Sequence, residues 1–168
     1  MSSSEEPGDV TVQTLGASLR RHSTATVLFH HAVAERLGLG PADHKCLDLV
    51  TERGPMTGSE LARITGLTSG AITGVVARLE RAGFLRREPD PQDRRKQLLH
   101  CTPKARRQIG EVFAELVDFS ALLSGFDEDQ LATVAEFLDR ATDVALRQVA
   151  LLRAHAMTKP QGGGHEPR

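Results

Sequence analysis

Hydrophobic residues recur at helical spacing through the N-terminal third of the chain. From about Val10 to Leu37, one face of a predicted helix carries the positions Val12, Leu15, Leu19, Ser23, Thr26, His30, Val33 and Leu37. Gly38 is expected to end this helix. A second helix is predicted from Pro41, a residue that suits the first helical turn, to about Arg53.

Two shorter helices with clear capping signals follow. The run from Thr57 to Glu60 (TGSE) fits a capping box and opens a helix that Gly66 is expected to stop. Thr68 or Ser69 caps the next helix, which ends at Gly83 and has an apolar stripe formed by Ile72, Val75, Val76 and Leu79. Two short helices joined by a tight turn predict a helix-turn-helix.

The segment after Gly83 has the pattern of a β-hairpin. Two short strands are predicted, at about Phe84 to Glu88 and Lys96 to Cys101, with a turn rich in Pro and Asp between them. Thr102 and Pro103 then start a helix that breaks near Gly125, and a last helix begins at Asp127. The predicted fold class is mainly α, with a winged helix-turn-helix lobe and a two-stranded wing between long N- and C-terminal helices.

The charge is distributed unevenly along the chain. Residues 57–107 carry eleven Lys and Arg against five Asp and Glu, a net +6, although the whole chain carries −1. A basic lobe indicates a polyanionic partner, and a solvated charged surface is the alternative. All aromatic residues are Phe, so stacking on single-stranded bases is poorly supported. The start is acidic, without a signal-peptide pattern, and no apolar run is long enough for a membrane span, so a cytoplasmic protein without a membrane partner is expected.

The most specific motif lies in the basic segment. Asp90-Pro91-Gln92-Asp93-Arg94-Arg95 precedes Leu-Leu-His-Cys-Thr-Pro-Lys at 98–104 and follows Arg-Ala-Gly-Phe-Leu at 81–85. With these motifs, the segment from about Leu39 to Arg107 resembles the MarR family of winged-helix regulators. The resemblance implies a homodimer that is clasped through its N- and C-terminal helices and binds a palindromic operator in double-stranded DNA.

This resemblance divides the chain into five parts. Residues 10–38 form an N-terminal dimerisation helix, 39–102 the DNA-binding lobe, and 103–158 the C-terminal dimerisation helices. Residues 1–9 and 159–168 are polar and are predicted to be disordered.

The second helix of the helix-turn-helix would enter the major groove. Its DNA-contact candidates are Ser69, Gly70, Thr73, Gly74, Ala77, Arg78 and Arg81. The outward face is almost bare, and each interior glycine costs about 1 kcal/mol relative to alanine. Close approach of the backbone to the groove would explain both glycines. Alternatively, the buried stripe tolerates them, or they make room for a neighbouring helix.

The hairpin turn supplies the wing. Arg94 and Arg95 can enter a narrow minor groove, where the negative potential is enhanced. By the resemblance, Arg95 matches the family's minor-groove residue and Asp93 matches the acid that braces it. Lys96 is a further DNA contact. It is expected to meet phosphates together with Arg86, Arg87, Lys104 and Arg107.

The first helix also holds a candidate ligand site. Ser23, Thr26 and His30 interrupt its apolar stripe, and buried polar groups need partners. The resemblance implies a small effector, often an aromatic anion, that His30, His31 and His44 could contact. A core histidine bonded to a carbonyl is the alternative, and a pH response near 6.5 is another.

Other chemistry is poorly supported. No catalytic motif appears, so an enzyme is not expected. No cofactor is expected either. His100 and Cys101 would point to opposite faces of a strand, and His44 and Cys46 do not share a helix face, so no metal site is predicted.

The prediction is a transcriptional repressor released by a small ligand. The alternatives are an effector-independent architectural DNA-binding protein and a metal- or redox-responsive regulator.

Overall fold

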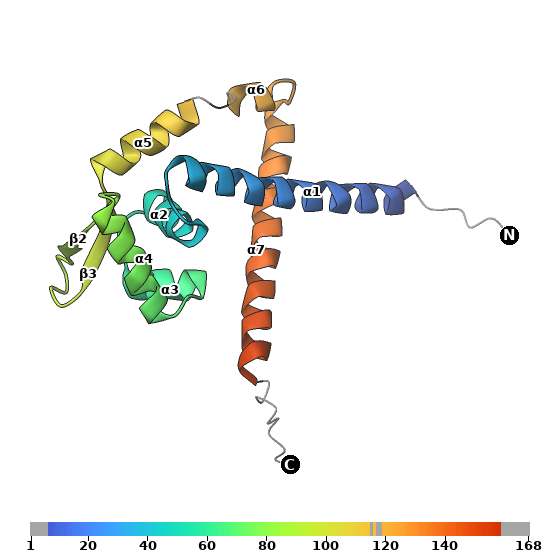
Figure 1. Ribbon diagram of the computed structural model, residues 1–168. Coiled ribbons are helices and arrows are strands. Elements are labelled where there is room, and N and C mark those ends of the chain that lie inside the picture. The colour runs from blue at the N-terminus through green and yellow to red at the C-terminus, as the bar shows by residue number, and fades with distance from the viewer. Residues whose placement is uncertain (1–6, 115, 117–118, 159–168) are drawn as a thin grey trace, which may run out of the picture. The chain divides into compact units, whose positions relative to one another are not determined.

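The computed structural model describes residues 7–158 apart from 115, 117 and 118, in two compact units, Met1–Leu116 and Val117–Arg168. The first unit contains α1 (Pro7–Arg36), α2 (Pro41–Arg53), β1 (Met56–Thr57), α3 (Gly58–Thr65), α4 (Ser69–Arg81), β2 (Leu85–Pro89), β3 (Gln97–Cys101) and α5 (Pro103–Ala114) (Figure 1). The second contains α6 (Phe119–Leu123) and α7 (Glu128–Thr158).

The core of the first unit lies where α2, α3 and α4 meet the sheet. The side chains that are most completely buried include Leu47 and Val50 of α2, Leu61 of α3 and Leu79 of α4. All four stripe residues predicted for α4 are buried. The helix-turn-helix is therefore held by the apolar face that the sequence pattern identified.

The wing belongs to a three-stranded sheet, so the prediction of two strands was incomplete. The strand order is β1-β3-β2, and both pairings are antiparallel, with Leu85 opposite Cys101 and Met56 opposite Leu99. Strand β1 has only two residues, too few to show an alternating pattern. It is a strand because its two residues pair with the edge of β3.

The capping predictions for α3 and α4 are confirmed. Thr57 and Glu60 form both bonds of a capping box, with the Thr57 amide donating to the Glu60 carboxylate at 2.7 Å. The hydroxyl of Thr68 accepts the Ala71 amide at 3.2 Å. Gly66 ends α3 in the left-handed conformation at φ 75°, where a Cβ would be strained.

Two predicted boundaries differ from the structure. Helix α1 begins at Pro7, so residues 7–9 are helical and the predicted disorder was wrong there; residues 1–6 and 159–168 lie outside the described residues. The helix predicted from Pro103 to near Gly125 is divided into α5 and α6. Leu116, between them, is exposed.

Much of the predicted apolar face of α1 is uncovered. Val33 and Ala34 are buried and Leu37 packs against the core, but Val12 is 69% exposed and Ser23 is also exposed. Several large apolar side chains of α7 are exposed as well, among them Leu146 and Leu152. Over the described residues, none of the helices combines the length and apolarity that crossing a bilayer requires.

Candidate DNA interface

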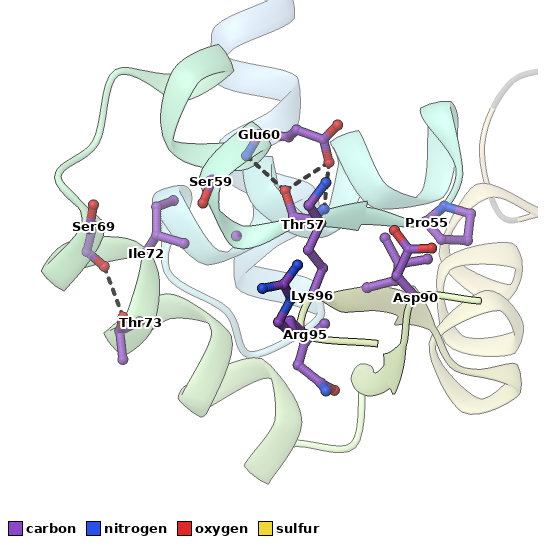
Figure 2. Close-up of a pocket in the computed structure, with 13 residues that line it drawn as sticks. Pro55, Thr57, Ser59, Glu60, Ser69, Ile72, Thr73, Asp90, Arg95 and Lys96 are labelled. Atoms are coloured by element: carbon purple, nitrogen blue, oxygen red, sulfur yellow. Dashed lines mark hydrogen bonds between the residues drawn. The ribbon is translucent and has the colours of Figure 1, made fainter. Parts of the chain in front are cut away.

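Helix α4 presents most of its candidate contact residues to solvent. Ser69, Gly70, Thr73, Arg78 and Arg81 are exposed, and Gly74 and Ala77 are half-buried. The Thr73 hydroxyl donates to the Ser69 carbonyl at 2.9 Å (Figure 2), so its hydrogen is already used within the helix. Its methyl group and oxygen lone pairs remain for a partner.

The two glycines of α4 are not needed for packing within the protein. A Cβ on Gly70 would meet nothing within 4 Å, and a Cβ on Gly74 would meet only Nη1 of Arg78, at 3.4 Å. Among the described residues, neither glycine makes room for a neighbouring helix. The two glycines lower the stability of α4 and contribute no packing among the described residues. A partner that approaches the α4 backbone closely would explain their presence.

Arg78 has an intramolecular role that sequence reasoning missed. Its Nε donates to Asp43 Oδ2 at 2.8 Å and its Nη2 to Oδ1 at 2.6 Å, which joins α4 to the first turn of α2. The Asp43 side chain is 8% exposed, and bonding to this carboxylate raises the pKa of Arg78. The pair helps to orient α4, while Nη1 and the second hydrogen of Nη2 remain available to an acceptor on a partner.

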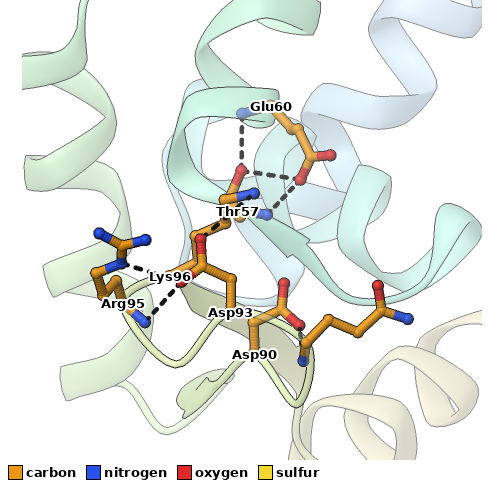
Figure 3. Close-up of polar contacts among 7 residues, drawn as sticks. Thr57, Glu60, Asp90, Asp93, Arg95 and Lys96 are labelled. Carbon is orange, nitrogen blue, oxygen red and sulfur yellow. Dashed lines mark hydrogen bonds and ion pairs between the residues drawn. The ribbon is translucent and has the colours of Figure 1, made fainter.

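The wing turn is ordered by its own acidic side chains. Asp93 Oδ1 accepts the Arg95 amide at 3.2 Å and Arg95 Nε at 3.4 Å, so the contact that the resemblance implies is present (Figure 3). Asp93 also lies 3.9 Å from Nζ of Lys96. The Arg95 side chain is 94% exposed. Arg94 is exposed too and makes no hydrogen bond or ion pair within the described chain.

A groove of about 710 Å³ lies between α4, the start of α3 and the wing (Figure 2). Ser69 and Thr73 line it from α4, while Arg95 and Lys96 line it from the wing turn. Hydrogen bonds from the backbone and hydroxyl of Thr57 lower the pKa of Glu60, which also lines the groove. The groove therefore combines hydroxyls and two cations with two carboxylates, those of Glu60 and Asp90.

Several cations that were expected to meet phosphates are already paired in the free protein. Arg87 Nε lies 3.1 Å from both carboxylate oxygens of Glu80, and Arg86 forms an ion pair with Glu88. Nζ of Lys104 donates to the Ala82 carbonyl at 2.7 Å. Arg107 has no hydrogen bond or ion pair with any described residue.

The structure brings together two of the five candidate ligand residues. The rings of His30 and His44 are 5.5 Å apart, and Phe29 joins His30 to Phe113 through edge contacts at 5.5 and 5.9 Å. The Nδ1 atom of His30 is buried without a hydrogen-bond partner among the described residues, so this nitrogen does not make the carbonyl bond of the alternative. Ser23 and His31 are exposed, and the Thr26 hydroxyl donates to the His22 carbonyl.

His44 predicts a pH dependence of stability. Burial, with smaller contributions from His30 and Lys45, lowers its pKa below the ordinary 6.5, although Asp48 opposes the shift. Below 6.5 the unfolded chain therefore binds more protons than the folded one, and the free energy of unfolding should fall as pH drops through this value. Urea unfolding between pH 5 and 7.5 measures this. His44→Asn should flatten the dependence relative to the parent and to the control His22→Asn, and an equal slope in all three would contradict the assignment.

The cysteines lack the properties of redox sensors. Both are buried, and burial raises the pKa of Cys46 to about 11, so little thiolate forms near neutral pH. The Thr51 hydroxyl lies 3.4 Å from Sγ of Cys101. Among the described residues, no three His, Cys, Asp or Glu side chains gather closely enough to hold a metal ion.

Comparison with known proteins agrees with this geometry. The sequence model of the MarR family matches residues 39–96, which contain the helix-turn-helix and the wing turn. The HTH-type transcriptional regulator YcgE of Bacillus subtilis is 38% identical over 135 residues, which cover 80% of this chain and 88% of that protein. The chain belongs to the MarR family.

Solved structures of MarR-like regulators share the fold. The transcriptional regulator Tm0710 from Thermotoga maritima aligns with a TM-score of 0.58 at 27% identity, covering 82% of this chain and 98% of that one. A MarR family protein from Bacillus stearothermophilus aligns with a TM-score of 0.62 at 22% identity, covering 82% of this chain and 97% of that one. Like the rest of the MarR family, this chain is a winged-helix protein of transcription regulation that binds DNA.

Proposed function

We propose that this MarR-family protein is a homodimeric repressor that binds a palindromic operator and is released by a small aromatic or anionic ligand. The observation that carries the DNA-binding part is the exposed Arg95, braced by Asp93, on the same groove as the bare N-terminal half of α4. A cation on the wing and a bare helix suit simultaneous contact with a minor and a major groove.

Uncovered apolar side chains support the homodimer. On α1 they include Val12 and Leu28, and on α7 they include Leu146 and Leu152. Exposed apolar surface on this scale is typical of an interface, and a second copy would bury it. Dimerisation would also place two α4 helices so that they can engage half-sites about one DNA turn, roughly 34 Å, apart.

Selection from a random duplex library, followed by competition, tests this function. The enriched duplex should be palindromic, bind one dimer by analytical ultracentrifugation, and outcompete a random duplex of the same length. Placed in a promoter, it should lower reporter expression in the cytoplasm of a host that makes the protein. Equal affinity for both duplexes would favour an architectural DNA-binding protein, and a monomer on a non-repeated site would contradict the proposal.

The His30–His44 pair supports the ligand-release part, because the buried, unpartnered Nδ1 of His30 lies on a ring that contacts Phe29 and offers a polar contact beside an aromatic side chain. His30→Ala should shift the concentration of a benzoate- or phenol-type anion that releases the enriched duplex, with affinity for that duplex in the absence of anion unchanged. Anisotropy titrations measure both quantities. The matched control is His31→Ala, since His31 is exposed and stands outside the pair. Identical release curves for the three proteins would remove His30 from the ligand site.

A further inference from the structure

The three carbonyls at the exit of helix α4 are bound by the beginning of α5. Three successive carbonyls follow the helix, at Ala82, Gly83 and Phe84. Lys104 Nζ donates to the Ala82 carbonyl at 2.7 Å, and the Thr102 hydroxyl donates to the Gly83 carbonyl at 2.7 Å. The Thr102 amide donates to the Phe84 carbonyl at 3.0 Å. Two residues thus bind all three acceptors.

The chemistry at this position suits a cation from the protein itself. The last carbonyls of a helix lack intrahelical partners and carry partial negative charge, which an ammonium group neutralises. Nζ of Lys104 also lies 5.6 Å from the centre of the buried Phe84 ring. The stem of Lys104 packs over Gly83, where an added Cβ would meet Cδ and Nζ at 3.5 Å.

Helix α5 is itself anchored to the core. Its contacts with the carbonyls after α4 can therefore fix the orientation of α4. Thr102 caps α5 by accepting the Ala105 amide at 3.1 Å, and the side chain of Ala105 is fully buried. Ile109, one turn further along, packs against the core. The same threonine therefore ends one helix and begins the other.

From this geometry we infer that Lys104 is a positioning residue of the recognition helix α4, and that Thr102 shares this role. Without the cap, α4 can tilt about its exit. Its 13 residues span roughly 20 Å, so a tilt of about 5° moves the N-terminal end by nearly 2 Å. Contacts to base edges at that end require tighter placement than this. The inference rests on the DNA-binding function proposed above.

The salt dependence of binding separates positioning from a direct phosphate contact. Each phosphate contact that is lost lowers the slope of log K against log salt by about 0.9, or by about two for both copies of a dimer. A positioning lysine leaves this slope unchanged. Its loss instead weakens binding where base contacts matter and spares a random duplex.

The test compares Lys104→Met with the matched control Arg107→Met, which removes a cation from the same helix at a residue without a described partner. Full-length proteins are titrated by anisotropy at several salt concentrations against the enriched duplex and a random duplex. Lys104→Met should lower affinity for the enriched duplex about three- to tenfold, consistent with the usual strength of a charge at a helix end, with random-duplex affinity and slope unchanged. Arg107→Met should leave the ratio of the two affinities unchanged.

Conservative variants strengthen the test. Lys104→Arg keeps a cation at the Ala82 carbonyl and should restore the affinity ratio to within about twofold. Thr102→Val should lower the ratio in the same direction as Lys104→Met, whereas Thr102→Ser keeps the hydroxyl and should retain it.

Three results would overturn the inference: a slope reduced by about two, an equal loss on both duplexes, or no change on either. A parent protein that binds no duplex would remove the DNA-binding proposal itself. A parent that discriminates between duplexes while Lys104→Met behaves identically would remove only the positioning role.

Discussion

Arg95→Ala is expected to weaken binding to the enriched duplex by at least about tenfold, because each of two wings would lose a charge-assisted contact of about 1 kcal/mol or more. The Arg95 side chain projects from the turn, and its contact with Asp93 at 3.4 Å favours this outward orientation before DNA binds. The loss should be largest where A·T pairs lie under the wing, since a narrow minor groove has the stronger negative potential. Anisotropy titrations on duplexes with A·T or G·C at those positions measure it.

Arg94→Ala is the matched comparison for Arg95→Ala. It removes the same charge from the same turn, at a side chain that no described acid holds in place. We expect a smaller loss for Arg94→Ala, with little dependence on the A·T content under the wing. If Arg95→Ala retained parental affinity, or lost the same amount on A·T and G·C duplexes, the wing would not read the minor groove.

Gly70→Leu is expected to separate stability from DNA binding. Nothing lies within 4 Å of the position that a Cβ would take at Gly70, and leucine is a better helix former by up to about 1 kcal/mol. Thermal stability should therefore stay the same or rise. Affinity for the enriched duplex should fall at least about tenfold, since the new side chain would stand between the α4 backbone and the groove floor.

Gly110→Leu provides the control for this substitution. Gly110 lies on α5, is exposed, and also has open space around the position of a Cβ. The same exchange there should change thermal stability in the same direction and leave DNA affinity unaltered. Parental DNA affinity in Gly70→Leu would mean that the bare face of α4 does not approach the groove closely.

The elements that sequence reasoning predicted best are those specified by neighbouring residues. The capping box of Thr57 and Glu60 and the buried stripe of α4 each occupy a few consecutive turns, and both are present. The Asp93–Arg95 contact spans two residues and was implied by the family resemblance. Strand β1 was missed because its pairing residues on β3 lie more than 40 positions away along the chain.

The roles of several charged residues were predicted less well. Arg78 was predicted to contact DNA, and the structure adds a partner within the protein, Asp43, which is 35 positions distant. Lys104 looked like a phosphate contact, but the carbonyl that it binds is 22 positions distant. A periodic pattern shows which face a residue occupies; it does not show which backbone or carboxylate from another element reaches the same place.

The order of helices, the basic character of the lobe and the position of the wing turn could be derived from the chain as written, because capping, helical periodicity and short turns depend on residues close together in sequence. The bracing of Arg95 by Asp93 was implied by the family resemblance. Folding alone decided which cations are committed within the protein, since Arg78, Arg87 and Lys104 meet acceptors on other elements. It also decided that His30 and His44 lie together while His31 stands apart. The physical reason is that an ion pair or a capping bond forms between groups that packing brings within about 3 Å, a distance that spacing along the chain does not encode.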